Sequence, residues 1–243
     1  MHTGTFYAVS VGPGDPMDMT LRAKQVLEQA DVLVIPVKQA GEPSAAYGIA
    51  RQGADLSRAA LCEIVFPMKA HADYRTYLRG GALLPVEQAL EAGKQVAMVT
   101  LGDVSVYSTA TYVRQILAEK GYATQVIAGI PSFCAGAASA QYSLCENGES
   151  LLVLPGITAQ AEIEAALAQF ENVVIMKAGR TLSWLLPLLQ EQGLLEKTVM
   201  FRDVGMETAY VGEPKADGNS YFTTLLIKKG AVSYTHLTLP TKL

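Results

Sequence analysis

The sequence predicts an α/β protein of two domains, with a parallel-rich sheet in the amino-terminal half and a mixed sheet in the carboxyl-terminal half. In the first half, short apolar runs rich in β-branched residues alternate with stretches of helical periodicity. Strands that alternate with helices are typical of parallel α/β sheets. In the second half, two extended runs at 208–212 and 221–228 follow each other without an intervening helix, which predicts an antiparallel hairpin.

The first α/β domain is expected to span residues 1–128. Thr20 is the predicted N-cap of its first helix, and Gly121 stands where a helix C-cap is expected. A longer helical stretch is expected to break near Gly80 and Gly81, since glycine interrupts helices. The predicted strands are 5–11, 32–35, 60–66, 95–101 and 123–128, and the predicted helices are 20–30, 74–92 and 109–120.

The second, mixed α/β domain is expected to span residues 129–229. Residues 230–243, including His236, follow the last strand without a partner pattern, and we interpret them as a non-native tail. Before the two extended runs, the pattern predicts helices at 132–141, 158–170 and 182–192 and strands at 151–154, 173–177 and 198–203.

Composition limits the classes of function. Of the 243 residues, half are hydrophobic and 17% are charged, which is enough apolar material for a sizeable core. The net charge of -4 argues against nucleic acid as the main partner. Neither a signal peptide nor a membrane span is predicted, because no apolar run approaches the roughly 20 residues that a span needs. Three cysteines (Cys62, Cys134 and Cys145) without a CxxC pair predict reduced thiols, no metal site and a cytoplasmic location.

The first candidate site is the turn VGPGDP at residues 11–16, between a strand and a helix, where doubly wound folds bind ligands. It is neither a P-loop, since no GK[ST] follows, nor a complete GxGxxG fingerprint. Pro13 has no N–H to offer an anion, and the carboxylate of Asp15 would repel one. The turn therefore disfavours phosphate. The alternative is a stiff turn that contacts no ligand.

The second candidate site is TLGDVSVYST at residues 100–109, which also follows a strand. Gly102 permits a sharp exit with a positive φ. The carboxylate of Asp103 could bind a ribose hydroxyl or a cation, or it could simply cap a local turn. Thr109 is expected to cap the next helix.

Two further turns follow predicted strands. In AGIPSFCAGAASA, residues 128–140, small side chains would admit a ligand or a neighbouring helix. In VVIMKAGR, residues 173–180, Lys177 and Arg180 flank a glycine turn and could bind carboxylates. Ordinary solvated lysine and arginine side chains are the alternative.

Taken together, VGPGDP, LGDVSVYST, AGIPSF, MKAG and YFTTLLI resemble the tetrapyrrole methylase family of S-adenosylmethionine (SAM) methyltransferases. The resemblance covers about residues 5–229. It is closest to members that methylate C20 of precorrin-2 or cobalt-factor II in cobalamin synthesis, through LGDxSxYST, FPM at 66–68 and YFTTLLIKK. Val104 departs from the family pattern, which often has proline there.

The resemblance implies two α/β domains with SAM in the cleft between them, a tetrapyrrole as the small-molecule partner, and a homodimer. It places the macrocycle near the first glycine turn, which suggests Gly12, Gly14 and Asp15 as substrate contacts, with Arg180 as a further one. The positions that match the family's cofactor contacts are Pro13, Leu101, Gly102, Asp103, Val106, Pro131, Ser132, Lys177 and Ala178.

The implied chemistry is attack of an electron-rich C20 on the sulfonium methyl group, followed by loss of the C20 proton. Alignment alone can contribute about 7–11 kcal/mol in well-oriented cases. Asp103 and Tyr107 are the candidates to accept the proton, and water or the macrocycle itself are alternatives. Further candidate partners for the substrate carboxylates are Lys38, Arg51, Lys69, Arg75 and Arg79.

Three other functions remain open at this level. A sibling enzyme would methylate another carbon of a corrinoid precursor. A related RNA ribose methyltransferase is disfavoured by the acidic balance and by the lack of interleaved aromatic and basic residues. A binding module would hold a tetrapyrrole or nucleotide without turnover.

Overall fold

The computed structural model describes residues 4–66, 73–217 and 220–230 and divides into two compact units, one up to Pro131 and the other from Ser132 onward. This division falls shortly after the predicted boundary at 128/129. Part of the FPM motif (Pro67 and Met68), the candidate Lys69 and nearly all of the predicted tail, with His236, lie outside the described residues.

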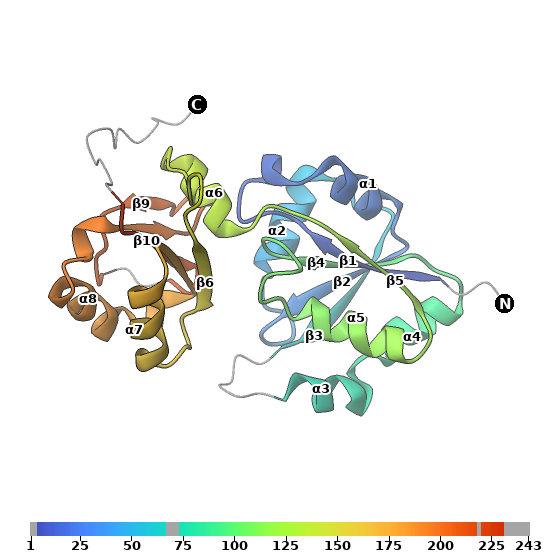
Figure 1. The fold of residues 1–243 in the computed structure, drawn as a ribbon. Helices are drawn as coiled ribbons and strands as arrows, with labels where there is room; N and C mark the ends of the chain where they lie inside the picture. Colours follow the sequence, from blue (N-terminus) through green and yellow to red (C-terminus); the bar gives the residue numbers. More distant parts are fainter. Residues whose placement is uncertain (1–3, 67–72, 218–219, 231–243) are drawn as a thin grey trace. The chain divides into compact units, whose positions relative to one another are not determined.

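The first unit contains the predicted parallel sheet (Figure 1). Its strand order is β3-β2-β4-β1-β5, and every neighbouring pair is parallel. Parallel sheets are usually covered on both faces, so their strands are apolar throughout, as the fully buried β4 is here. The strands are β1 (Thr5–Ser10), β2 (Val32–Val37), β3 (Ala60–Val65), β4 (Val96–Thr100) and β5 (Ala123–Ile127).

Helices cover both faces of this sheet. α1 (Leu21–Gln29) and α2 (Ala45–Gly53) pack on one face, and α4 (Leu84–Glu91) and α5 (Ala110–Glu119) on the other (Figure 1). Thr20 caps α1 as predicted, because its Oγ1 accepts a hydrogen bond from the backbone N–H of Ala23 at 3.1 Å. The sequence did not reveal α2, whose buried face consists of the small Ala46 and Ala50 with Ile49.

The predicted helix at 74–92 is broken, as expected, at its glycine pair. A short α3 (Tyr74–Tyr77) runs into the wide turn η2 (Leu78–Ala82), and α4 follows. Gly81 has a φ of +112°, outside the helical region, which ends one helical segment before the next begins.

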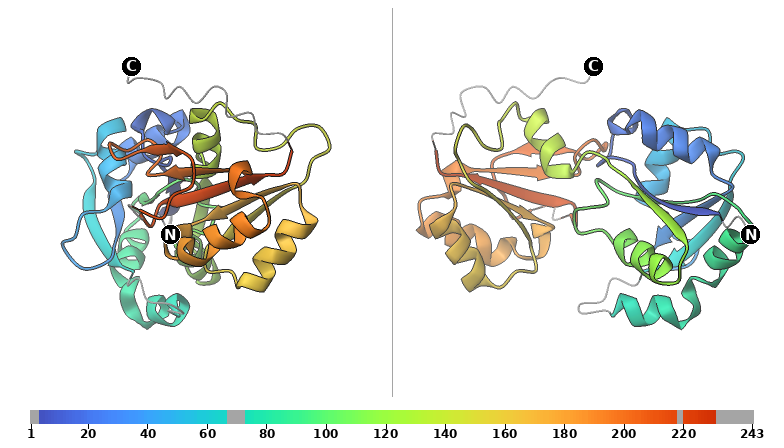
Figure 2. Two further views of the ribbon diagram at one scale, coloured as in Figure 1. Left: turned by 90° about the vertical axis from the view of Figure 1, so that its left-hand side faces the viewer. Right: turned by 45° about the vertical axis from the view of Figure 1, so that its right-hand side comes forward.

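The second unit contains the predicted mixed sheet, in the order β6-β7-β10-β8-β9. β6 and β7 are parallel, while β10 is antiparallel to both of its neighbours and β9 is antiparallel to β8. The views in Figure 2 show β10 (red) running through the middle of this sheet. The strands are β6 (Leu151–Pro155), β7 (Asn172–Met176), β8 (Thr198–Arg202), β9 (Tyr210–Gly212) and β10 (Thr223–Lys228).

The predicted hairpin of the last two strands is wrong, because β10 inserts between β7 and β8 and leaves β9 paired with β8 at the edge. Burial explains the order. All six residues of β10 are buried, which suits a central strand, whereas β9 has three residues, two of them only partly buried.

Helices also cover both faces of the second sheet. α7 (Gln160–Gln169) and α8 (Leu182–Glu191) pack against the side chains of β7, β8 and β10 that form the main core of this unit. α6 (Ser132–Ser139) packs on the opposite face, where a Cβ atom on Gly136 would lie 2.6 Å from the ring of Phe201. Gly136 thus lets α6 approach the sheet closely.

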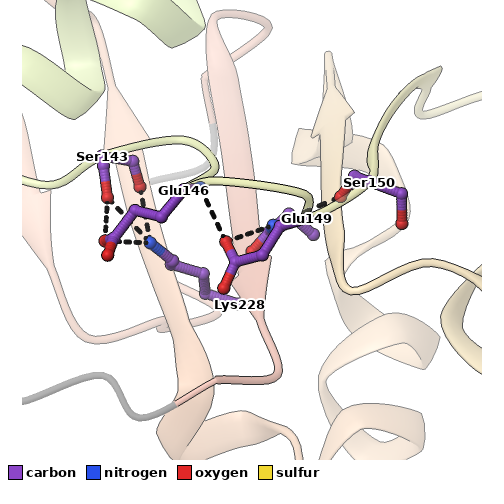
Figure 3. A network of polar contacts seen from close by, with 6 residues as sticks. Ser143, Glu146, Glu149, Ser150 and Lys228 are labelled. Atoms are coloured by element: carbon purple, nitrogen blue, oxygen red, sulfur yellow. Dashed lines mark hydrogen bonds and ion pairs between the residues drawn. The ribbon is translucent and has the colours of Figure 1, made fainter.

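A buried lysine attaches the segment between α6 and β6 to this sheet (Figure 3). Lys228, 8% exposed, donates from Nζ to the carbonyl oxygen (3.1 Å) and Oγ (2.9 Å) of Ser143 and to Glu146 Oε1 (3.1 Å). Beside it, Asn172 Nδ2 donates to Glu149 Oε2 at 3.0 Å. Two buried polar side chains of the sheet therefore hold the 140–150 segment in place.

Candidate functional site

The carboxyl ends of β1 and β4 form a topological switch point in the first unit. These strands are neighbours, but the chain leaves β1 through α1 toward β2, and it leaves β4 through α5 toward β5 on the other side of β1. Since α1 and α5 cover opposite faces, the two exits diverge. Ligands of open α/β sheets bind at such points, and the first two candidate turns lie there.

The two turns are joined through their glycines. The N–H of Gly102 donates to the carbonyl oxygen of Gly12 at 2.7 Å, and the N–H of Gly12 donates to that of Gly102 at 3.3 Å. Both glycines have a positive φ, +77° for Gly12 and +71° for Gly102, so the predicted sharp exit at Gly102 is confirmed. Two main chains therefore run in direct contact at the switch point.

The buried carboxylate of Asp103 connects three strand ends. Its Oδ1 accepts hydrogen bonds from the backbone N–H of Ser105 (2.8 Å) and from the hydroxyl of the same residue. Its Oδ2 accepts from the backbone N–H of Gly129, beyond β5, at 2.6 Å and from Ser10 Oγ, on β1, at 3.5 Å. Asp103 is 8% exposed. Its side chain thus holds the ends of β1, β4 and β5 together.

This environment decides the charge of Asp103. Burial by itself raises the pKa of the carboxyl group, but the hydrogen bonds from Ser105, Gly129 and Ser10 outweigh it, and the pKa lies below its usual value. The group is therefore an ionised acceptor with both oxygens occupied. Its candidate role as proton acceptor stays a prediction that this geometry does not favour.

Sequence reasoning missed two residues of this cluster, Ser10 and Gly129. Ser10 is fully buried, and its Oγ also accepts a hydrogen bond from the backbone N–H of Val104 at 2.9 Å. A Cβ atom on Gly129 would lie 2.3 Å from the Cβ of Ser10 and 2.8 Å from the carbonyl oxygen of Gly102. The available signals were a serine closing an otherwise apolar strand and the glycine of AGIP.

The rest of the second turn positions Tyr107 and starts α5. Tyr107 is 44% exposed and has a φ of +48°, and partial burial raises the pKa of its phenol, which keeps it protonated near neutral pH. Ser108 Oγ lies 2.8 Å from Thr100 Oγ1 and accepts from the N–H of Ala110 at 3.2 Å. Thr109 is at the N-cap position of α5 as predicted, but its side chain makes no capping hydrogen bond, and Ser108 Oγ accepts one from the first helical N–H instead.

The departure from the family pattern at Val104 has a packing reason. Val104 is 2% exposed and lies in the core cluster beneath the sheet. Leu101 is partly buried against the core on the other face, and the N–H of Val106 donates to the carbonyl oxygen of Asp103 at 3.2 Å. The loop is thus fixed by apolar contact and hydrogen bonds without a proline.

The first turn is closed by Asp15, whose Oδ1 accepts from the N–H of Met17 at 2.8 Å and caps the short helix η1 (Pro16–Asp18). Asp15 is exposed, while Pro13 and Gly14 are buried. Asp18 lies directly against Gly12. Burial, together with the nearby carboxylate of Asp15, raises the pKa of Asp18 above its usual value.

In the second unit, β6, β7 and β8 point the same way, so their carboxyl ends share one edge. Lys177 follows β7 with a φ of +59°, and its Nζ lies 5.4 Å from the centre of the Tyr221 ring. Ala178 is fully buried and Arg180 is exposed. At Gly179 a Cβ atom would lie 2.3 Å from the carbonyl oxygen of Ser220, so this turn touches the chain before β10.

The structure groups the sequence candidates by unit. Gly12, Gly102 and Asp103 meet in the first unit, and Lys177, Ala178 and Arg180 form one turn in the second. Pro131 ends the first unit, and Ser132 begins α6 in the second.

The basic candidates divide into two groups. Arg75 and Arg79 both approach Glu119, Arg79 at 2.6 Å, and Arg75 also donates to Gln115, so they belong to a polar cluster between η2, α3 and α5. Lys38 and Arg51 are exposed. Among residues 4–66, 73–217 and 220–230, no group of three or more side chains is arranged to bind a metal, and no helix has the length and apolar character of a membrane span.

A parallel sheet with glycine turns at its switch point, followed by a unit with a mixed five-stranded sheet, defines a two-unit α/β protein. The family model of Tetrapyrrole (Corrin/Porphyrin) Methylases matches residues 5–217. The chain belongs to this family.

Curated relatives match nearly the whole chain. The cobalt-precorrin-2 C(20)-methyltransferase of Salmonella typhimurium is 31% identical over 231 residues, which cover 93% of this chain and 97% of the relative. The precorrin-2 C(20)-methyltransferase of Sinorhizobium sp is 30% identical over 237 residues, covering 92% and 95%.

A solved structure has the same fold. It is the uroporphyrin-III C-methyltransferase from Thermus thermophilus in complex with S-adenosyl homocysteine. Its TM-score is 0.62 at 17% identity, with 93% of this chain and 98% of that chain covered.

Proposed function

We propose that this protein transfers a methyl group from SAM to C20 of precorrin-2 or its cobalt form in cobalamin biosynthesis. The observation that carries the proposal is the identity of about 30% to C(20)-methyltransferases over more than nine-tenths of the chain. The family match supports it, and so does the presence of LGDVSVYST in the hydrogen-bonded loop at the switch point.

The residues of the first unit fit SAM as methyl donor. Gly12 and Gly129 let neighbouring segments of the chain pack tightly at the switch point, since a Cβ atom on either would lie 3.0 Å or less from an atom of Asp18 or Ser10. The loops here are rich in glycine, and backbone groups of such loops can approach an adenosine or amino-acid moiety closely. We assign Pro13, Leu101 and Val106 to the cofactor with Gly102. A relative of the same fold holds S-adenosyl homocysteine.

In the second unit we assign the turn of Lys177 and Ala178 to the cofactor. Lys177 has a left-handed backbone conformation that is costly for a side chain of this size. Such strain is often retained at functional sites. Pro131 and Ser132, at the junction of the units, complete the proposed cofactor contacts.

SAM supplies an electrophilic methyl group, and the role of the chain is to align it with the substrate carbon and to exclude water. We propose that Asp103 acts by position, holding Gly129 and the 102–106 loop, because both of its oxygens are occupied. Tyr107, a neutral phenol, is suited to donate a hydrogen bond to substrate rather than to accept the C20 proton.

For the substrate, we propose that the Gly12–Gly14 main chain faces the macrocycle and that Arg180 binds one of its carboxylates, with Asp15 at the edge of the same site. Arg180 and Asp15 are exposed, as these roles require. We further propose a cytoplasmic homodimer, which light scattering coupled to size-exclusion chromatography would test; a monomer at micromolar concentration would contradict it.

The decisive experiment incubates the purified protein with precorrin-2 and SAM carrying a ¹³C-labelled methyl group. The label is expected at C20. Label on another carbon would identify a sibling enzyme, and binding of SAM without transfer would identify a binding module; either result overturns the proposal. The same assay with cobalt-factor II, run in parallel, identifies the preferred substrate, a point on which the names of the two relatives differ.

A further inference from the structure

The carboxyl edge of the second unit contains a second buried aspartate, Asp203, directly after β8. Its Oδ1 accepts a hydrogen bond from Ser220 Oγ at 2.6 Å, and its Oδ2 accepts from Thr208 Oγ1 at 2.9 Å. Its backbone N–H also points at the carbonyl oxygen of Phe222 at 3.4 Å. Asp203 is 9% exposed. Its hydrogen bonds connect the segment that follows β8 to the segment that precedes β10.

Ser220 connects Asp203 to the turn at Lys177. Its carbonyl oxygen would be only 2.3 Å from a Cβ atom on Gly179, so the 220 main chain lies directly on the 177–179 turn. Ser220 Oγ also accepts from the N–H of Phe222 at 3.1 Å, which fixes the turn into β10. The next residue, Tyr221, carries the ring that faces Lys177 Nζ.

The backbone of Asp203 shows that the arrangement is constrained. Its φ is +49°, and Lys177 is also left-handed at +59°. An aspartate tolerates this region better than most residues, and a lysine tolerates it poorly. Two non-glycine residues in this region at one sheet edge require surrounding contacts that hold them there.

We propose that Asp203 is a positioning residue for cofactor binding: through Ser220 it holds the Lys177–Ala178 turn in the shape that contacts SAM. This inference rests on the proposed function, because it takes the Lys177 turn as part of the cofactor site. Asp203 does not itself touch the cofactor in this scheme. It supports the second unit as Asp103 supports the first.

The test measures SAM affinity by calorimetry and steady-state kinetics for Asp203→Ala, Asp203→Asn and Ser220→Ala. Asp203→Ala is expected to weaken SAM binding about tenfold, equivalent to about 1.4 kcal/mol, close to the lower end of the range for one hydrogen bond to a charged group. The KM for SAM should rise in parallel, while kcat at saturating SAM changes by less than about twofold. Asp203→Asn keeps one acceptor and should lie between Asp203→Ala and wild type.

Two controls separate positioning from general loss of stability. Glu207→Gln removes the same charge from the same loop at an exposed site and should leave SAM affinity unchanged. Thr208→Val removes the other partner of Asp203 without touching Ser220, and should lower stability more than affinity. The double variant Asp203→Ala/Ser220→Ala should weaken SAM binding by less than the sum of the two single effects, since both single variants remove the hydrogen bond between Asp203 and Ser220.

Unchanged SAM affinity in folded Asp203→Ala and Ser220→Ala would overturn the inference. If Asp203→Ala does not fold, Asp203→Asn and Ser220→Ala carry the same test. If wild-type protein binds no SAM, the proposed function fails. Amide exchange then tests separately whether Asp203 holds the turn at residues 177–179. The amide of Thr181, which donates to the carbonyl oxygen of Ala178 at 2.8 Å, must exchange faster in Asp203→Asn, and an unchanged rate overturns the link to this turn.

Discussion

At the scale of single residues, the candidate site depends on buried hydrogen-bond acceptors and on glycines that let neighbouring segments of the chain pack in direct contact. Asp103 contacts three residues that are far from one another in the sequence, namely Ser10, Ser105 and Gly129. Its carboxylate compensates backbone and hydroxyl donors that burial would otherwise leave without partners. We propose that Asp103 shapes the candidate site through the segments that it holds together.

Asp103→Ala is expected to weaken SAM binding more than it lowers kcat, because the residue shapes the loop that we propose to contact SAM and has no free oxygen for proton transfer. Calorimetry and steady-state kinetics on the same preparation measure both effects. Glu91→Gln, an exposed charge change on α4, is the control. Equal SAM affinity in wild type and Asp103→Ala would contradict the expectation.

Gly129→Ala is expected to lower the free energy of unfolding by about 1–3 kcal/mol, because the added methyl group overlaps Ser10 and the main chain of Gly102. The matched control is Gly48→Ala within α2, where a Cβ atom meets nothing within 4 Å. That change should stabilise by about 0.5–1 kcal/mol, since alanine favours helix over glycine. Denaturant unfolding measures both, and effects of the same sign would refute the steric argument.

The sequence was sufficient to select candidate turns at the ends of strands, but not to predict which hydrogen bonds hold them. Gly102 and Asp103 could be chosen because they follow an apolar strand, and the positive φ of Gly102 follows from its residue type. The partners of Asp103 could not be chosen, because they depend on β1 lying between β4 and β5, a long-range pairing that local patterns do not encode.

At the scale of elements, the order of the strands in the second sheet could not be predicted from the sequence. The apolar run of β10 indicated a strand, but the preceding extended run suggested a hairpin that the structure does not contain. Burial of every β10 side chain, including Lys228, shows that the strand gains more from two neighbours than from an edge position. The sequence did not predict α2, because its buried face is made mainly of alanine, which gives a weak periodic signal.

Lys228→Met is expected to loosen the segment between α6 and β6, because Ser143 and Glu146 lose their shared ammonium partner (Figure 3). The hydrogen bond from Ser143 and the interactions with Lys228 lower the pKa of Glu146, so this pKa should rise in the variant. Amide exchange at Glu149, which donates to the carbonyl oxygen of Glu146 at 2.9 Å, should accelerate. Lys229→Met, directly after the same strand, is the control, and equal exchange in both variants would refute the anchoring role.

At the scale of the whole molecule, ionised carboxylates link stability to pH. The backbone N–H of Gln95 and the guanidinium of Arg58 lower the pKa of Asp31, and the hydrogen bonds to Asp103 lower its pKa despite burial. A carboxyl group with a lower pKa in the folded state stabilises the protein above its unfolded pKa, and this contribution is lost as pH falls through the folded value. Asp18, with a raised pKa, acts in the opposite direction.

The free energy of unfolding is therefore expected to fall as the pH drops from about 4 toward 2, the range below the ordinary aspartate pKa of about 3.9. Urea unfolding at pH 7 and pH 3 measures the difference. Asp103→Asn should be less stable than wild type at pH 7, and the gap should narrow at low pH, where wild-type Asp103 is itself protonated. A gap that is independent of pH would show that charge is not the cause.

The central position of β10 has a consequence for how the chain is made. The first sheet is complete once β5 has been synthesised, so that unit can fold while the ribosome is still producing the rest. The second sheet cannot close in the same way, since β7 and β8 have no shared neighbour until residues 223–228 emerge. During that interval two apolar strands must stay apart, with unpaired edges that invite association with other chains. A nascent chain arrested before residue 223 would therefore carry one finished unit and one that depends on protection by chaperones.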